Sequence, residues 1–181
     1  TGSGPANHGI VSNDWYDRYS RKALYCVSDS TVKPLGTTSV SGKMSPRNLF
    51  TSTIGDELKL ASNFRSKVIG VALKDRGSIL TAGSGADAAY WHDPYSNNMI
   101  SSTYYFNELP KWVENFNKRK VADSLLSKSW TTLLPIEKYT ESTPDNTPYE
   151  GLFDGEKTPT FPHNLPALKD SSSELIRQVP M

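Results

Sequence analysis

Lys-Val-Ile-Gly-Val-Ala-Leu-Lys-Asp-Arg-Gly, residues 67–77, is the stretch that decides the fold. Its six apolar or small residues, 68–73, run without a break and lead into two cations, Lys74 and Arg76. A continuous apolar run of this length predicts a strand buried on both faces, as in parallel sheets. Ligands of open α/β sheets bind beyond the carboxyl ends of such strands. The stretch therefore predicts an α/β fold with a ligand site beside the two cations.

Lys74 and Arg76 lie two positions apart, so their side chains point the same way if the strand extends that far. A guanidinium offers a planar fork of donors and an ammonium a compact charge, and both suit phosphate. The alternative interpretation is that both are solvated charges at a strand end. Asp75 between them either orients the cations or faces the other way.

The flanking segments extend the α/β pattern. A helix is predicted over 53–61, because its apolar residues share one face and its acidic residues lie near its amino end. An amino-terminal hairpin is expected from short strands at 13–18 and 21–27, followed by a loop over 28–43. Three further strands are expected at 79–80, 88–91 and 99–105, and two helices follow them at 109–118 and 121–126.

The composition changes after residue 133. More than half of the 12 prolines follow this point, among Thr, Asn, Asp and Ser. Such a composition favours an irregular surface excursion without a core of its own. The sequence is therefore divided into an α/β substrate-binding region, 1–133, and a Pro-rich irregular excursion, 134–181, packed against it.

The overall composition and charge limit the classes of partner and site that this chain can have. The 181 residues carry 20 basic and 19 acidic side chains, and the net charge of +1 does not favour nucleic acid or an anionic membrane as partner. No apolar run approaches the length of a membrane span. The single cysteine, Cys26, excludes an intramolecular disulfide and a cysteine-cluster metal site, and we expect it to be a small buried residue.

Motifs for metal binding and nucleophilic catalysis are weak. The three histidines lack the spacing of a zinc-binding helix. Of these, His8 is expected to cap a turn, His92 has only a neighbouring Asp, and His163 is expected to be solvated in a loop. Ala-Gly-Ser-Gly-Ala at 82–86 loosely resembles a nucleophile elbow, but alanines replace its outer glycines, and a plain turn is favoured. The aromatic residues at 90, 91, 104, 105 and 112 are expected to pack in the core rather than stack on a substrate.

Three stretches, in this order, resemble the alkaline phosphatase superfamily in its bacterial phosphate-monoesterase branch. They are His-Gly-Ile-Val-Ser-Asn-Asp-Trp-Tyr-Asp at 8–17, the predicted helix and strand at 53–77, and the segments of 86–113 that include Ala-Asp-Ala-Ala-Tyr-Trp and Leu-Pro-Lys-Trp-Val. The resemblance covers roughly residues 1–119. It implies a partial alkaline-phosphatase-like α/β fold with a mixed sheet, short helices and a Pro-rich irregular carboxyl-terminal region.

The resemblance also implies a chemistry. In such enzymes a Thr or Ser forms a covalent phospho-enzyme, assisted by two zinc ions. It maps Asn13 onto an amide that donates to a phosphoryl oxygen, and Lys74 and Arg76 onto cations that hold the remaining oxygens. The nucleophile and the metal-binding stretches are expected outside these residues. We therefore expect two Zn in a full-length parent, none in this chain, and no turnover by the chain alone.

The charge of the expected substrate favours the phosphate-monoesterase branch of the superfamily. A phosphate monoester carries two negative charges on nonbridging oxygens, which suit two cations and an amide, whereas a diester has one fewer charge and a second substituent. The expected partner is thus a small phosphate ester, and the resemblance implies a periplasmic or secreted parent. Two alternatives stay open: a phosphodiesterase or nucleotide pyrophosphatase of the same superfamily, and a non-catalytic anion-binding module. The sequence carries no signal for an oligomeric state.

Overall fold

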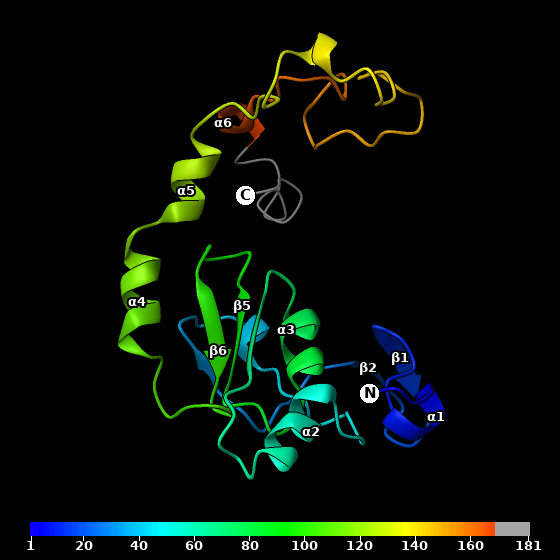
Figure 1. The fold of residues 1–181 in the computed structure, drawn as a ribbon, viewed down its shortest axis with the longest axis vertical. Coiled ribbons are helices and arrows are strands. Elements are labelled where there is room, and N and C mark those ends of the chain that lie inside the picture. Colours follow the sequence, from blue (N-terminus) through cyan, green and yellow to red (C-terminus); the bar gives the residue numbers. More distant parts are fainter. Residues whose placement is uncertain (169–181) are drawn as a thin grey trace. The chain divides into compact units, whose positions relative to one another are not determined.

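The computed structural model describes residues 1–168 and divides into two compact units, Thr1–Lys118 and Arg119 onward. The sequence places the boundary later, after residue 133. The structure differs because α5 (Val121–Leu126) already belongs to the second unit. Figure 1 shows the elements of both units, and each unit is described by itself below.

A mixed four-stranded sheet of order β3-β6-β5-β4 forms the centre of the first unit. β4 pairs in parallel with β5, whereas β5 with β6 and β6 with β3 pair antiparallel. The strands are β3 (Pro34–Leu35), β4 (Ile69–Ala72), β5 (Ala88–His92) and β6 (Met99–Ser102). The mixed sheet with short helices confirms the predicted fold class. β3 and a 3-10 turn, η1 (Val40–Gly42), fall within the segment expected to be loop only.

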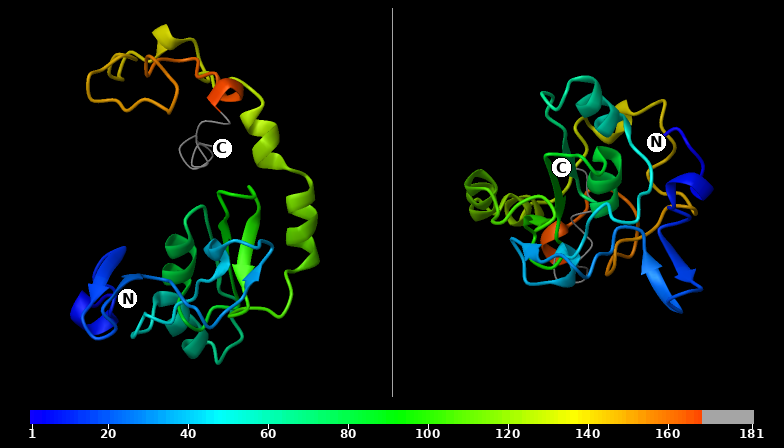
Figure 2. Two further views of the ribbon diagram at one scale, coloured as in Figure 1. Left: turned by 180° about the vertical axis from the view of Figure 1, so that it is seen from behind. Right: turned by 90° about the horizontal axis from the view of Figure 1, so that it is seen from below.

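Helices cover both faces of this sheet. α2 (Ile54–Ala61) and α3 (Asp75–Ala82) lie on one side and α4 (Lys111–Lys118) on the other, as Figures 1 and 2 show. The core on the α3 side contains Ala89 and Trp91, and the core on the α4 side contains Ala88 and Tyr90. Successive β5 residues thus serve opposite cores, as the alternation of side chains along a strand requires. Tyr90 and Trp91 of β5 pack in the core, as expected, whereas the same prediction is wrong for Tyr104 and Trp112, which are exposed.

β4 is shorter and less buried than its apolar sequence predicts. The side chains of Ile69 and Val71 are 58% and 65% exposed. The prediction of a strand buried on both faces is wrong, because β4 is an edge strand and α3 covers only the face that carries Gly70. A Cβ at Gly70 would lie 2.2 Å from the carbonyl oxygen of Ser78, so this close approach of helix and strand requires glycine.

The residues after β4 form a helix rather than a continued strand. Lys74 is extended and directly precedes α3, and Arg76 lies in its first turn. The prediction that the strand extends to Arg76 is therefore wrong, and so is the strand predicted at 79–80. Asp75 suits the positive end of a helix. The buried residues Ser78, Ile79 and Ala82 follow a helical spacing, which the short apolar pair at 79–80 does not reveal.

The other predicted elements of the first unit are confirmed. α2 begins with a capping box in which Thr53 Oγ1 accepts from the Asp56 amide and the Asp56 carboxylate accepts from the Thr53 amide at 2.8 Å. β1 (Asp14–Asp17) and β2 (Lys22–Tyr25) form the expected hairpin. α1 (Pro5–His8) precedes it, and His8 Nδ1 accepts from the Ile10 amide, which confirms the turn-capping role. α4, and α5 of the second unit, also lie within the predicted helices.

A buried carboxylate anchors the loops around β5 and β6. Asp93 is fully buried and accepts from the hydroxyls of Thr37, Ser41 and Ser96 at 2.6, 2.6 and 2.7 Å. Burial alone would raise the pKa of Asp93, but these hydroxyls outweigh it, and the pKa is lowered. Asp29 is held similarly by Ser45 and Thr31, and its pKa is also lowered.

Acid is expected to destabilise the first unit. A lowered folded-state pKa gives stabilisation that is present above the ordinary aspartate pKa of about 3.9 and is lost as the pH falls through the folded value. Thermal unfolding midpoints should therefore fall as the pH is lowered below about 4. Asp93→Asn should be less stable at neutral pH and show a weaker acid dependence. An unaltered pH profile in the Asp93→Asn variant would contradict the anchoring role of this carboxylate.

The second unit has a small apolar cluster. Ala122 and Leu126 of α5 pack with Leu165 and Leu168 of α6 (Leu165–Leu168). A 3-10 turn, η2 (Ile136–Lys138), lies in the irregular chain between these helices. The late leucines of the Pro-rich part thus pack on α5, a helix within the predicted region 1–133, and share its apolar cluster.

His163 of the second unit is buried rather than solvated. Its side chain is 7% exposed, and Nδ1 lies 2.7 Å from Glu156 Oε1. The rings of Trp130, Phe153 and Phe161 surround it. The prediction of a solvated loop histidine is wrong because these aromatic residues, distant in sequence, enclose the loop.

Candidate substrate-binding site

The β1–β2 hairpin joins Asn13 to the core of the first unit. The Cys26 amide donates to the Asn13 carbonyl oxygen at 2.9 Å, so Asn13 lies at the open end of the hairpin, opposite Cys26. Cys26 and Val27 are buried against Ile79 and Trp91, which confirms the expected buried cysteine. Burial raises the pKa of the Cys26 thiol, as is usual for a cysteine in apolar surroundings.

Tyr25, the residue before Cys26, connects the hairpin to the first turn of α3. Its hydroxyl donates to Asp75 Oδ1 at 2.5 Å and accepts from Arg76 Nη1 at 3.1 Å. Asp75 Oδ1 also accepts from the Arg76 amide at 2.7 Å. Burial and the Asp75 carboxylate raise the pKa of Tyr25 far above its ordinary value, so the hydroxyl stays protonated. The hydrogen bond that Arg76 donates to the Tyr25 hydroxyl in turn raises the pKa of Arg76.

Lys74 and Arg76 lie between the carboxyl end of β4 and the first turn of α3. β4 is paired in parallel with β5, and this end of a parallel strand is where α/β sheets bind ligands. Two cations beside the amino end of an eight-residue helix create a local positive potential. The predicted anion site would therefore lie at a strand-to-helix turn and not along a continuous strand.

The structure links the three predicted residues only indirectly. Asn13 pairs through its carbonyl oxygen with Cys26, the residue after Tyr25, and Arg76 donates to the Tyr25 hydroxyl. Lys74 directly precedes α3, whose first turn holds Arg76. Tyr25 was not predicted, because nothing in its local sequence marks it. Asp75, left open between two roles, holds the Tyr25 hydroxyl and the Arg76 amide.

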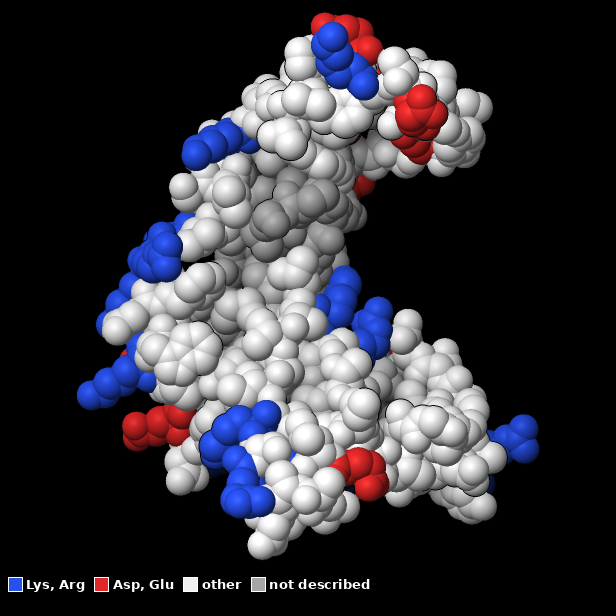
Figure 3. All heavy atoms as spheres, viewed as in Figure 1, with Lys and Arg blue, Asp and Glu red and all other residues white. Residues whose placement is uncertain are grey.

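Charge elsewhere in the first unit forms no broad field on the face drawn in Figure 3, where basic and acidic side chains occur in small groups. Over the whole chain the net charge is +1. Attraction of an anion thus depends on the local placement of Lys74 and Arg76 rather than on long-range steering.

Zinc does not fit the described residues. Within 1–168, no three His, Cys, Asp or Glu side chains come together as a metal site. His8 Nδ1 is used by the Ile10 amide, and His163 is engaged by Glu156 in the second unit. We derive no catalytic step through zinc from these residues.

In the same part of the chain, no helix is long and apolar enough to cross a membrane.

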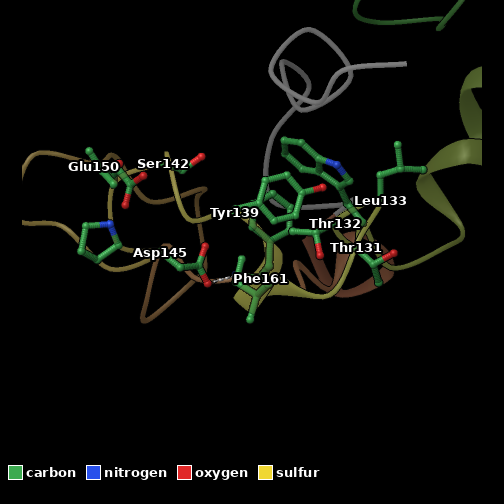
Figure 4. A pocket seen from close by; sticks show the side chains of 12 residues that line it. Thr131, Thr132, Leu133, Tyr139, Ser142, Asp145, Glu150 and Phe161 are labelled. Atoms are coloured by element: carbon green, nitrogen blue, oxygen red, sulfur yellow. Dashed lines mark hydrogen bonds between the residues drawn. The ribbon is translucent and has the colours of Figure 1, made fainter.

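Two cavities carry no anion site. One, of about 940 Å³, lies within the second unit and is lined by residues that include Tyr139, Asp145 and Glu150 (Figure 4). Asp145 accepts from the Phe161 amide at 3.0 Å and Glu150 from the Thr147 amide at 3.2 Å, so both carboxylates stabilise loops. The other, of about 410 Å³, lies beside β4 and α4 and is lined by apolar and aromatic side chains such as Val71 and Trp112.

Comparison with known protein families shows to which family this chain belongs. The pattern of the type I phosphodiesterase / nucleotide pyrophosphatase family matches residues 1–168. The chain belongs to this family. It is an alkaline phosphatase superfamily chain, as the resemblance in its sequence predicts, and the match extends beyond residue 119 into the second unit.

Relatives from the superfamily match nearly the whole chain. Alkaline phosphatase PafA of Elizabethkingia meningoseptica is 53% identical over 99% of this chain and 33% of its own length. Alkaline phosphatase PhoV of Synechococcus elongatus is 46% identical with the same coverage. The crystal structure of wild-type PafA matches with a TM-score of 0.92 and 52% identity, over 99% of this chain and 35% of PafA. The chain thus spans about a third of the length of these relatives.

Proposed function

We propose that this chain is the phosphate-binding part of a longer phosphate monoesterase. Asn13, Lys74 and Arg76 bind the nonbridging oxygens of the transferred phosphoryl group. The observation that carries the proposal is the pair of cations at the carboxyl end of β4, with Arg76 oriented by Tyr25. The relatives named alkaline phosphatases support the activity.

A PafA variant supports the choice of residues. A solved structure carries substitutions at one Thr, one Asn, one Lys and one Arg of that enzyme, and its substituted Lys and Arg lie two positions apart. Lys74 and Arg76 have the same spacing, and Asn13 precedes them in the same order. The matching residue types, order and spacing favour Asn13, Lys74 and Arg76 as the corresponding residues of this chain.

The charges and donor groups of the three site residues support a phosphate monoester as the substrate. Lys74 supplies a compact ammonium and Arg76 a planar fork that pairs with two oxygens, while Asn13 adds a neutral donor. Such donors stabilise charge on the equatorial oxygens of the transferred group. The nucleophile, the covalent phospho-enzyme and two zinc ions are assigned to other parts of the longer protein. We place that protein in the periplasm or outside the cell, as the superfamily resemblance implies.

The longer protein should hydrolyse a monoester faster than a matched diester. We expect kcat/KM for p-nitrophenyl phosphate to exceed that for its methyl diester by at least about tenfold, since a dianion gains a further charge-assisted contact at the site. Steady-state kinetics with both substrates at one pH measure this ratio. A diester preference would contradict the proposal.

The family description favours one second candidate, a type I phosphodiesterase or nucleotide pyrophosphatase. In that case the diester above and a nucleoside triphosphate are the better substrates. A non-catalytic anion-binding module predicts instead that the longer protein hydrolyses neither substrate. Such a module should still bind inorganic phosphate in calorimetry, and Arg76→Ala should abolish that binding.

A further inference from the structure

We propose that Tyr25 is a positioning residue for Arg76, whose hydroxyl keeps the guanidinium apart from Asp75 and fixed in one orientation toward the phosphate ester. The proposal rests on the proposed function, because it assigns a role toward the same anion. It adds a residue that contacts no substrate and acts through Arg76.

The donors and acceptors of the hydrogen bonds among Tyr25, Asp75 and Arg76 can be assigned in only one way. A guanidinium can only donate and a carboxylate can only accept, so the one hydroxyl proton of Tyr25 must point to Asp75 while a lone pair accepts from Arg76 Nη1. Within residues 1–168 the guanidinium donates only to Tyr25, so its other donors are available there to a ligand. Arg76 is thereby oriented without losing its capacity for paired contacts with phosphoryl oxygens.

Tyr25 also separates two opposite charges. Asp75 and Arg76 both lie within hydrogen-bond distance of the Tyr25 hydroxyl, and an arginine close to a carboxylate can form a bidentate ion pair with it. Such a pair would occupy the fork and offset its positive charge. The Tyr25 hydroxyl, 2.5 Å from Asp75 and 3.1 Å from Arg76, satisfies both groups instead.

Tyr25 is itself firmly held. Its ring packs against the core that includes Cys26 and Trp91. Its carbonyl oxygen accepts from both the amide and the hydroxyl of Ser28 at 2.9 Å. A partly buried aromatic side chain has few rotamers, so its hydroxyl is a rigid support, whereas a long arginine side chain is flexible on its own.

Tyr25→Phe in the longer phosphatase isolates the hydroxyl. We expect kcat/KM for p-nitrophenyl phosphate to fall about tenfold to a hundredfold, the range for a catalytic group displaced by about 1 Å. Inhibition by inorganic phosphate should weaken in parallel. Tyr19→Phe is the matched control, because Tyr19 lies in the same hairpin and is 99% exposed, and it should leave both values unchanged.

A double-mutant cycle with Arg76→Ala separates positioning from a general structural effect. In the Arg76→Ala background, Tyr25→Phe should change kcat/KM less than about twofold, because no guanidinium remains to be positioned. Equal losses in both backgrounds would overturn the role of Tyr25 and leave the proposed function standing. An Arg76→Ala variant with unchanged monoesterase activity would instead overturn the proposed function itself.

Discussion

Lys74→Ala combined with Arg76→Ala is expected to lower kcat/KM of the proposed longer phosphatase for a phosphate monoester by about a thousandfold or more. Removing a single preorganised donor to a developing oxyanion costs about a hundredfold to a thousandfold in rate. The double variant removes two donors, both of them charged. Because the cations act on the same phosphoryl group, the two losses need not multiply. Steady-state kinetics on the single and double variants measure the effect.

A charge-matched control is available at the other end of β4. Arg65 and Lys67 are also two positions apart and exposed, but they precede the strand. Lys67 pairs with Asp87 at 3.0 Å, and exposed pairs contribute little to stability. Arg65→Ala with Lys67→Ala changes the net charge equally and should leave kcat/KM within about threefold, because long-range steering is weak for so small a change. An equal loss in this control would show that net charge and not position matters.

Ile79→Ala is expected to lower the free energy of unfolding of this chain by about 3–5 kcal/mol. Ile79 of α3 is fully buried among Cys26, Trp91 and Ile100, so the shortened side chain leaves a cavity in the core that supports the site. Urea unfolding monitored by tryptophan fluorescence gives the difference.

Ile69→Ala is the matched control for that substitution. Ile69 of β4 is 58% exposed, so the same change of side chain should cost less than about 1 kcal/mol. Similar losses at both positions would contradict the packing described for α3 and β4.

The alternation of apolar segments predicted most of the first unit. The hairpin, α2, β5, β6 and α4 each have a local signal, such as the capping pattern at Thr53 or the period of the apolar residues. The same signal led to wrong predictions for β4 and α3. An apolar run has the same composition in an edge strand and a central one, and only the sheet order shows that Ile69 and Val71 are uncovered.

The candidate site was predicted only in part. Lys74 and Arg76 are visible as a pair in sequence, and the superfamily resemblance adds Asn13. Tyr25 lies 50 residues from Asp75, and a contact over that separation depends on the tertiary packing of the hairpin against α3. The core of the second unit escaped prediction for the same reason, since α5 and the late leucines are far apart in sequence.

The central claim is that Lys74 and Arg76 hold the two charges of a phosphate monoester. Its most direct test measures kcat/KM of the Lys74→Ala, Arg76→Ala double variant and the unsubstituted longer enzyme on a monoester and a methyl diester with one leaving group. We predict a monoester loss at least about tenfold larger than the diester loss, because the diester has one charged oxygen fewer to lose contacts. Equal losses on the two substrates would contradict the account.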